Sequence, residues 1–250
     1  MAHKNKYFIA NWKMYGDFSS FRIINLVNNY IIKNKSKSKV IFCVPSILIS
    51  HFSNRLKKSK ILIGAQNCHE LNKSGPYTGA INSKMIKNAG AKYVIIGHSE
   101  NRNNGDTDKL INAKIKSAIS NGLVVIFCIG ESFKQRKQNQ TNKILSLQIN
   151  KGLNSVKKIN KIIVSYEPVW SIGTGKIPTQ KQLNKAIAFI SNKLNNKFKN
   201  RHQIKIIYGG SVNESNIKEL AAIKNIDGFL IGGASQSPKK FIDILKNCYM

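Results

Sequence analysis

The sequence predicts a closed (β/α)8 barrel in which eight parallel strands alternate with helices. Three observations support this fold class. The chain has 250 residues, and one such barrel needs about 250. Apolar residues make up 42% of the composition, which is enough for a large core. Short apolar, β-branched runs occur eight times in order along the chain. We therefore expect residues 1–250 to form a single domain.

Each apolar run is nearly continuous, without period-two alternation. This pattern is typical of strands that are covered on both faces, as in a parallel sheet. The predicted strands are Tyr7–Ala10, Val40–Val44, Ile61–Ala65, Tyr93–Ile96, Leu123–Cys128, Ile162–Val164, Ile204–Ile207 and Gly228–Ile231.

The segments between these runs have helical patterns. Residues Phe18–Ile32 place apolar side chains near helical spacing. Thr179 and Gln182 form a predicted capping box, in which each side chain satisfies a backbone donor of the other residue. A doubly wound open sheet is the alternative architecture. Eight consecutive strand–helix units without a long linker favour closure into a barrel, which places the site on the loops that follow the strands.

The chain is strongly basic, with 41 Lys and Arg against 11 Asp and Glu and a formal net charge of +30. Such a balance suggests nucleic acids or membrane surfaces as partners. A biased composition is the simpler interpretation, because Lys, Asn and Ile are abundant along the whole chain. Many lysines directly precede predicted strands, where cations suit helix C-termini, and in a barrel they lie opposite the site. These are Lys37, Lys39, Lys58, Lys60, Lys92, Lys157, Lys158 and Lys161. We therefore expect any nucleic-acid binding to be non-specific.

Apolar stretches and cysteines indicate a cytoplasmic protein. The longest apolar run, Leu123–Ile129, is far shorter than the ~20 residues that span a bilayer. The stretch Tyr7–Ala10 is too short for a secretory signal. The cysteines have no CxxC spacing, so we expect reduced thiols and neither disulfides nor zinc. They are Cys43, Cys68, Cys128 and Cys248.

Polar residues gather directly after the predicted strands. Asn11 and Lys13 follow the first strand, His98, Ser99 and Glu100 the fourth, Glu131 the fifth, Glu167 the sixth and Ser211 the seventh. For any one of them, a structural role such as capping is an equally good explanation. Scattered surface residues would not favour one end of the strands so consistently, so the set indicates a site there.

Several short motifs are incomplete. Residues Gly173–Lys176 resemble part of a P-loop, but Trp170 stands where the first glycine is required. Pro178 at the third glycine position excludes a dinucleotide fingerprint as well. Gly97–Asn101 and Gly209–Asn213 both lack the closing glycine of a nucleophile elbow. The sequence therefore argues against a serine hydrolase.

Two glycine-rich segments remain, Tyr208–Ser211 and Gly232–Ser235, after the last two strands. In barrel enzymes these loops commonly form a phosphate site. Glycine lets backbone N–H groups approach an anion, and a following helix N-terminus adds partial positive charge. Ordinary turn glycine is the alternative explanation.

Six segments, in order and at the proper spacing over nearly the whole chain, resemble those of the triosephosphate isomerase family, whose fold is the TIM barrel. They are Asn11–Lys13, Gly97–Glu100, Tyr166–Trp170, Ile172–Lys176, Tyr208–Val212 and Gly228–Gly233. The resemblance implies interconversion of dihydroxyacetone phosphate and D-glyceraldehyde 3-phosphate through an enediolate, a reaction of glycolysis and gluconeogenesis. It implies a small phosphorylated triose as substrate, with no cofactor and no metal.

The resemblance also implies the residues of the site. Glu167 would move the proton between the two carbons, and His98 would act as a neutral electrophile. Lys13 and Asn11 would contact the substrate and steady its developing negative charge. The phosphate would be bound by the backbone N–H groups of Gly173, Ser211, Gly232 and Gly233.

By the same resemblance, residues 168–176 would form a lid. Ile172 and Leu230 would cover the Glu167 carboxylate, and removing water makes a carboxylate a stronger base. Trp170 would swing with the lid, resting near Glu131. The predicted lid and supporting residues are Glu100, Glu131, Trp170, Ile172 and Leu230.

Residues 66–78 resemble the loop that, in this family, inserts into a second subunit beside the catalytic groups, so we expect a homodimer. The chain departs from the family pattern near that contact. Ala80 stands where Glu is usual, Asn101 where Arg is usual, and Asp106 where Glu is usual. Pro178 occupies a lid-hinge position that is normally a small residue.

Two other functions are alternatives. One is a barrel isomerase of another small sugar phosphate, although the complete lid and short phosphate loops argue against a longer substrate. The other is a binding protein selected for its charge, which would not need Glu167, His98 and Lys13 together.

Overall fold

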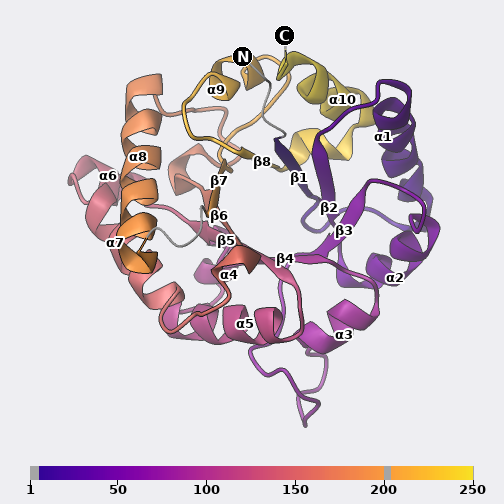
Figure 1. The fold of residues 1–250 in the computed structure, drawn as a ribbon, viewed down its shortest axis with the longest axis horizontal. Helices are drawn as coiled ribbons and strands as arrows, with labels where there is room; N and C mark the ends of the chain where they lie inside the picture. Colours follow the sequence, from indigo (N-terminus) through magenta and orange to yellow (C-terminus); the bar gives the residue numbers. More distant parts are fainter. Residues whose placement is uncertain (1–5, 200–203, 250) are drawn as a thin grey trace.

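The computed structural model describes residues 6–199 and 204–249. Eight parallel strands form a closed barrel in chain order, and β1 pairs with both β2 and β8 (Figure 1). The strands are β1 Tyr7–Asn11, β2 Lys39–Cys43, β3 Leu62–Ala65, β4 Tyr93–Ile96, β5 Val124–Ile129, β6 Ile162–Tyr166, β7 Lys205–Tyr208 and β8 Gly228–Ile231. The predicted barrel is confirmed, and the rival open sheet is excluded.

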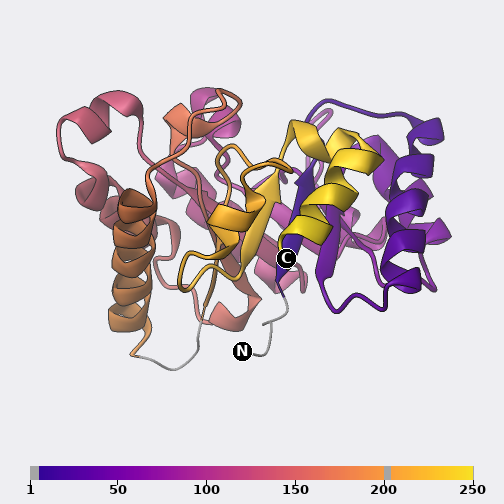
Figure 2. The same ribbon diagram turned by 90° about the horizontal axis from the view of Figure 1, so that it is seen from above.

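Helices surround the barrel as an outer ring, and the view from the side shows them packed against the strands (Figures 1 and 2). The α-helices are α1 Phe21–Lys33, α2 Ser46–Arg55, α3 Ser83–Asn88, α4 Ser99–Asn103, α5 Asp108–Ser120, α6 Phe133–Lys137, α7 Thr141–Gly152, α8 Gln180–Phe198, α9 Ile217–Ala221 and α10 Pro238–Asn247. The short 3-10 helices are η1 Phe18–Ser20, η2 Ile159–Lys161, η3 Val169–Ser171 and η4 Gly233–Gln236.

The core has two layers because the strands are buried on both faces. Ile9, Ile95 and Ile207 belong to the cluster inside the barrel. Their strand neighbours, such as Phe8 and Ile96, belong to the larger cluster between barrel and helices. This arrangement explains why the runs are apolar without alternation.

Most predicted strand ends differ from the structure by at most one residue, and two predicted elements differ by more. The predicted sixth strand stops before Ser165, whereas β6 continues to Tyr166, where Ser165 pairs with Cys128. Ser165 is fully buried and donates to Glu167, so a polar residue stays inside the strand. The predicted helix over 18–32 is divided into a 3-10 turn, capped by Asp17, and helix α1. The capping box of Thr179 and Gln182 is present at α8.

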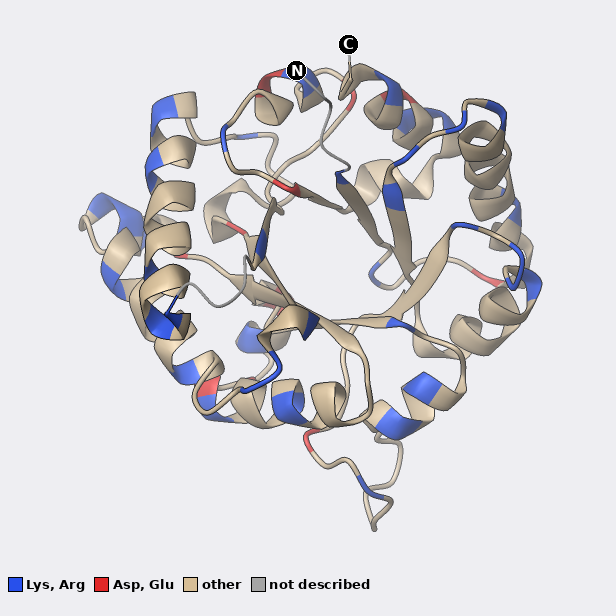
Figure 3. Ribbon diagram, in the orientation of Figure 1, with Lys and Arg blue, Asp and Glu red and all other residues tan. Residues whose placement is uncertain are grey.

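Lys and Arg are spread around the whole helix ring (Figure 3). Several mark the amino ends of strands: Lys39 begins β2, and Lys92 and Lys161 directly precede β4 and β6. Burial and the neighbouring charges of Lys92 and Lys161 lower the pKa of Lys87. These lysines therefore lie near one another, at the end of the barrel opposite the ends that carry the site.

All four cysteines are free and buried. Burial raises the pKa of the Cys68 thiol to about 12 and that of Cys248 to about 11, which leaves both as thiols. Within the described parts of the chain, no helix is both long and apolar enough to span a membrane.

Candidate active site

A pocket of about 390 Å³ lies on the loops that follow the strands. Nine of the predicted site residues line it: Asn11, Lys13, His98, Ile172, Gly173, Ser211, Leu230, Gly232 and Gly233. They come from the loops after β1, β4, β6, β7 and β8, and from the strands β1 and β8 themselves. The carboxyl end of a parallel barrel is where such loops converge, so residues far apart in sequence meet there.

Asn11 is the last residue of β1, one residue further than the predicted strand, and Lys13 follows the strand. Lys13 has a φ of +56°, a left-handed conformation that is costly for a side chain other than glycine. The Asn11 Oδ1 atom accepts from the Lys13 backbone N–H at 3.2 Å, and Gln66 Nε2 donates to the Lys13 carbonyl at 2.9 Å. The Lys13 ammonium pairs with Glu100 Oε1 at 2.6 Å, and its side chain is a third exposed. The strained backbone thus holds a cation at the mouth of the pocket.

His98 lies between β4 and α4 with its side chain only 6% exposed. Its Nδ1 atom accepts from the backbone N–H of Glu100 at 3.3 Å. An accepting Nδ1 leaves the ring proton of a neutral imidazole on Nε2. The Nε2 atom is 3.7 Å from Glu167 Oε2. The imidazole therefore presents its Nε2–H donor on the side of the pocket where Glu167 lies.

Glu167 directly follows β6 and is 2% exposed. Ser165 Oγ donates to its Oε1 atom at 3.0 Å, whereas its buried Oε2 atom has no hydrogen-bond partner in the described part of the chain. Gly209 makes room for this carboxylate, because a Cβ atom there would lie 2.6 Å from Glu167 Cγ. A buried carboxylate oxygen without a partner is rare. Here it leaves the Oε2 atom of Glu167 available to accept a proton beside His98.

Glu131 is a buried carboxylate with a different role from that of Glu167. It is fully buried and accepts from the Tyr166 hydroxyl at 3.2 Å, from Trp170 Nε1 at 3.3 Å and from Arg136 Nη1 at 2.9 Å. Burial and the Glu131 charge raise the pKa of Tyr166 well above its usual range. Glu131 therefore anchors the start of the segment 168–176, as the resemblance implies for Trp170.

Segment 168–176 lies against the loop that follows β7. Ser211 Oγ donates to the Ser171 carbonyl at 2.7 Å and accepts from the Gly175 N–H at 3.2 Å. The Ser171 hydroxyl lies 3.0 Å from the Tyr208 hydroxyl. Burial raises the pKa of Tyr208 to about 12, so it remains protonated at neutral pH. Gly173 and Gly175 have φ values of +69° and +74°, which glycine adopts without strain.

Backbone donors surround the far end of the pocket. The N–H groups of Gly173, Gly232 and Gly233 donate to no acceptor among the described residues. The Ser211 N–H donates to Ser171 Oγ at 3.4 Å, a long bond. A Cβ atom on Gly233 would meet nothing within 4 Å, so open space lies in front of it. Backbone N–H groups that face open space without an acceptor form a suitable binding site for an anion.

Sequence reasoning missed several residues of this site. Ser171, Arg136 and Lys240 were not singled out, yet Ser171 is a fully buried residue within the lid segment and Lys240 lines the pocket. Tyr208 was noted only as part of a glycine-rich segment. The one available signal was the polar Ser171 inside an otherwise apolar stretch from Val169 to Ile172. Within the part of the chain that the structure describes, no group of His, Cys, Asp or Glu could hold a metal ion.

Fold and pocket together define the class of protein: a closed parallel α/β barrel with a polar site at the carboxyl ends of its strands. Comparison with known proteins narrows this class. A model of the family "Triosephosphate isomerase" matches residues 6–248. The chain therefore belongs to the triosephosphate isomerase family, and the resemblance seen in its motifs is confirmed.

Individual relatives agree over the full length of the chain. It is 40% identical to the triosephosphate isomerase of Thermodesulfovibrio yellowstonii over 245 residues, which cover 96% of this chain and 98% of that protein. It is 38% identical to that of Dictyoglomus thermophilum, with 98% of this chain and 100% of that protein covered. The crystal structure of triosephosphate isomerase from Bartonella henselae superposes with a TM-score of 0.90 at 35% identity, covering 98% of this chain and 100% of that one.

Proposed function

We propose that this chain interconverts dihydroxyacetone phosphate and D-glyceraldehyde 3-phosphate. The observation that carries the proposal is the free Oε2 atom of Glu167, buried and 3.7 Å from His98 Nε2 beside the pocket. A carboxylate oxygen without a partner can accept a proton from carbon. The adjacent N–H donor can hydrogen-bond to the substrate oxygen on which charge develops.

The reaction needs one base and a set of donors. Glu167 removes a proton from the carbon next to the carbonyl, and the electron pair moves onto the carbonyl oxygen as an enediolate. The Nε2–H of His98 and the Lys13 ammonium stabilise that oxygen, with the Asn11 amide beside them. The neighbouring hydroxyl then gives up its proton while the charged oxygen gains one, beside the Nε2 atom of His98. Return of the Glu167 proton to the former carbonyl carbon then gives the isomer. General base catalysis supplies typically ~10²–10⁴-fold, so preorganised donors must supply much of the remaining acceleration.

The substrate phosphate is bound, in this proposal, by the N–H groups of Gly173, Ser211, Gly232 and Gly233. Three of these donors have no acceptor among the residues that the structure describes, and the long bond of Ser211 is one that a phosphate oxygen can replace. The apolar side chains of Ile172 and Leu230 line the same pocket and exclude water from the base.

Substrate length separates this proposal from an isomerase of a longer sugar phosphate. The test is turnover of D-glyceraldehyde 3-phosphate beside that of pentose and hexose phosphates under the same conditions, with each product followed directly by NMR. Fast turnover of the triose with negligible turnover of the longer sugars is expected. Equal or faster turnover of a longer sugar phosphate would contradict the proposal.

Assembly as a homodimer is part of the proposal. The loop between β3 and α3, which contains residues 66–78, projects beyond the helix ring (Figure 1). It exposes Leu71 and Tyr77, and exposed apolar side chains also lie after β1 and at the start of α2, at Met14 and Ile47. A C₂ dimer would bury both patches at once. Because Gln66, at the base of this loop, bonds to the Lys13 carbonyl, the contact would also brace the site.

The proposed reaction also indicates the pathway and the cellular location of the protein. We propose a single domain over residues 1–250 that acts in the cytoplasm in glycolysis and gluconeogenesis. Nucleic acids would bind at most non-specifically through the basic surface, because cations surround the whole ring and gather at the end opposite the site (Figure 3).

A further inference from the structure

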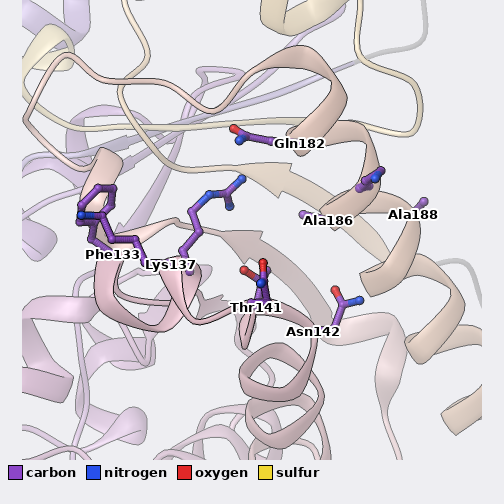
Figure 4. Close-up of a pocket in the computed structure, with 10 residues that line it drawn as sticks. Phe133, Lys137, Thr141, Asn142, Gln182, Ala186 and Ala188 are labelled. Atoms are coloured by element: carbon purple, nitrogen blue, oxygen red, sulfur yellow. The ribbon is translucent and has the colours of Figure 1, made fainter.

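A second pocket lies outside the barrel, between α6 and α7 on one side and α8 on the other. Its volume is about 790 Å³, larger than the 390 Å³ of the active-site pocket. Figure 4 shows Gln182 and Ala186 on α8 across from Lys137 and Thr141 on the facing segment. Its lining residues, all within the described ranges, include no Asp or Glu: Phe133, Arg136, Lys137, Asn139, Thr141, Asn142, Gln182, Lys185, Ala186 and Ala188.

Positive charge in this pocket is poorly compensated. Three cations line it, Arg136, Lys137 and Lys185. The Lys137 ammonium lies 4.7 Å from the centre of the Phe133 ring, and neither Lys137 nor Lys185 has an ion pair within the described residues. No carboxylate lines the pocket beside these cations, so a bound anion would compensate their charge.

Arg136 uses only part of its hydrogen-bonding capacity. Its Nη1 atom donates to the fully buried Glu131, and its remaining N–H groups have no acceptor within the described residues. A guanidinium has five donors in a planar fork that matches phosphate oxygens. Thr141, at the first turn of α7, also lines the pocket, and that turn has neither a side-chain cap nor an acidic residue.

We infer that this pocket binds a small molecule that carries two or more phosphate groups. The free edge of Arg136 and the ammonium groups of Lys137 and Lys185 would hold the phosphates. Pockets of 300–1,000 Å³ hold ligands of drug-like size, so a single phosphate ion would leave most of this one unfilled. No carboxylate among the lining residues is available to hold a cation in the same place.

Such a ligand would act on the lid through Arg136. The guanidinium carbon lies 4.9 Å from the centre of the Trp170 ring, and the Phe133 ring lies 6.2 Å from it. Removing Arg136 from buried Glu131 would strand a carboxylate at high cost. A bound ligand would therefore share Arg136 with Glu131 and would not displace it. By restraining the guanidinium, the ligand would hold the Trp170 ring, and with it the lid, in the docked position. Since lid opening limits turnover in many enzymes, kcat and KM should fall together. This effect on kinetics rests on the proposed function.

Binding is tested by titration calorimetry and tryptophan fluorescence with tripolyphosphate, ATP and inorganic phosphate, at physiological salt. Each titration is carried out with and without saturating glycerol 3-phosphate, which blocks the active-site pocket. The pocket variant is Lys137→Gln with Lys185→Gln. The control is Lys181→Gln with Lys193→Gln, which removes the same charge from α8 residues that do not line the pocket.

Tripolyphosphate and ATP should bind one to one, more tightly than inorganic phosphate, with a change in tryptophan emission. The pocket variant should bind at least about tenfold more weakly, because lost bonds to charged groups are each worth that much. The control should bind like the parent. Equal weakening in both variants, or binding that glycerol 3-phosphate abolishes, would overturn the inference.

Kinetic results separate the two proposals. Failure of the proposed function would appear as absent turnover without any ligand, whatever the calorimetry shows. Intact binding with unchanged kcat and KM would overturn the coupling to the lid. A parallel fall of both constants in the parent and the control, absent from the pocket variant, would support it.

Discussion

Gly209 is the residue that allows Glu167 its position, and Gly209→Ala tests this directly. A Cβ atom at residue 209 would lie 2.6 Å from Glu167 Cγ and 2.7 Å from Ser165 Oγ, well inside the 3.4–4 Å of ordinary contact. The backbone φ of residue 209 lies outside the left-handed range, so alanine causes no φ strain there and the conflict is with the neighbouring side chains alone. Glu167 must therefore move by an amount on the order of 1 Å, and such a misplacement can cost about 10²-fold in rate.

The assay for this variant is kcat with D-glyceraldehyde 3-phosphate, beside the melting temperature. Gly64→Ala is the matched control, because its Cβ atom would lie 2.7 Å from Cys43 Sγ and away from Glu167. Overpacking of this kind costs about 1–3 kcal/mol in stability, so both variants should melt at lower temperature. Only Gly209→Ala should lose about 10²-fold in kcat. Equal losses of kcat in both variants, or a kcat for Gly209→Ala within a factor of two of the parent, would refute the reasoning.

Four further predictions concern the base, the hinge, the assembly and the charge. Glu167→Asp shortens the arm that carries the base, so kcat should fall by about 10²-fold with KM little changed; a loss below twofold would remove Glu167 as the base. Pro178, buried directly before the N-cap of α8, fixes φ at the hinge, so Pro178→Ala should change kcat and KM together; unchanged kinetics at several viscosities would contradict this. Salt screens repulsion between subunits of net charge +30. Sedimentation should therefore show a tighter dimer at high salt, with specific activity lost on dissociation; a fully active monomer would contradict this. Short oligonucleotides should bind in a steeply salt-dependent way without competing with substrate; competition at physiological salt would place them at the site.

Most of the fold could be predicted because a parallel barrel repeats one pattern. Each strand is buried on both faces, so its apolar run is visible without any knowledge of its neighbours. The boundaries differ where a polar residue is buried by a partner that the sequence does not reveal. Ser165 is such a residue, since its hydroxyl bonds to Glu167, two residues along the chain, inside the barrel.

The residues of the site could be predicted less completely than the fold. The residues proposed for catalysis and phosphate binding could be placed at one end of the barrel because they follow strands or lie in short motifs. Arg136 and Ser171 could not, because each acts through a contact formed only on folding: Arg136 with Glu131 and Trp170, and Ser171 with Tyr208 and Ser211. A composition rich in lysine also hides Arg136 and Lys185 among many similar residues.

The central claim is that the buried Glu167 carboxylate removes the proton from carbon. Glu167→Gln tests it most directly, because the amide keeps the size of the side chain and removes the base. The measurement is kcat/KM for D-glyceraldehyde 3-phosphate, with the binding of glycerol 3-phosphate as a check on the pocket. We predict a fall in kcat/KM of about 10²–10⁴-fold or more, with glycerol 3-phosphate bound as by the parent. A variant that binds glycerol 3-phosphate normally and keeps kcat/KM within a factor of ten of the parent would contradict the claim.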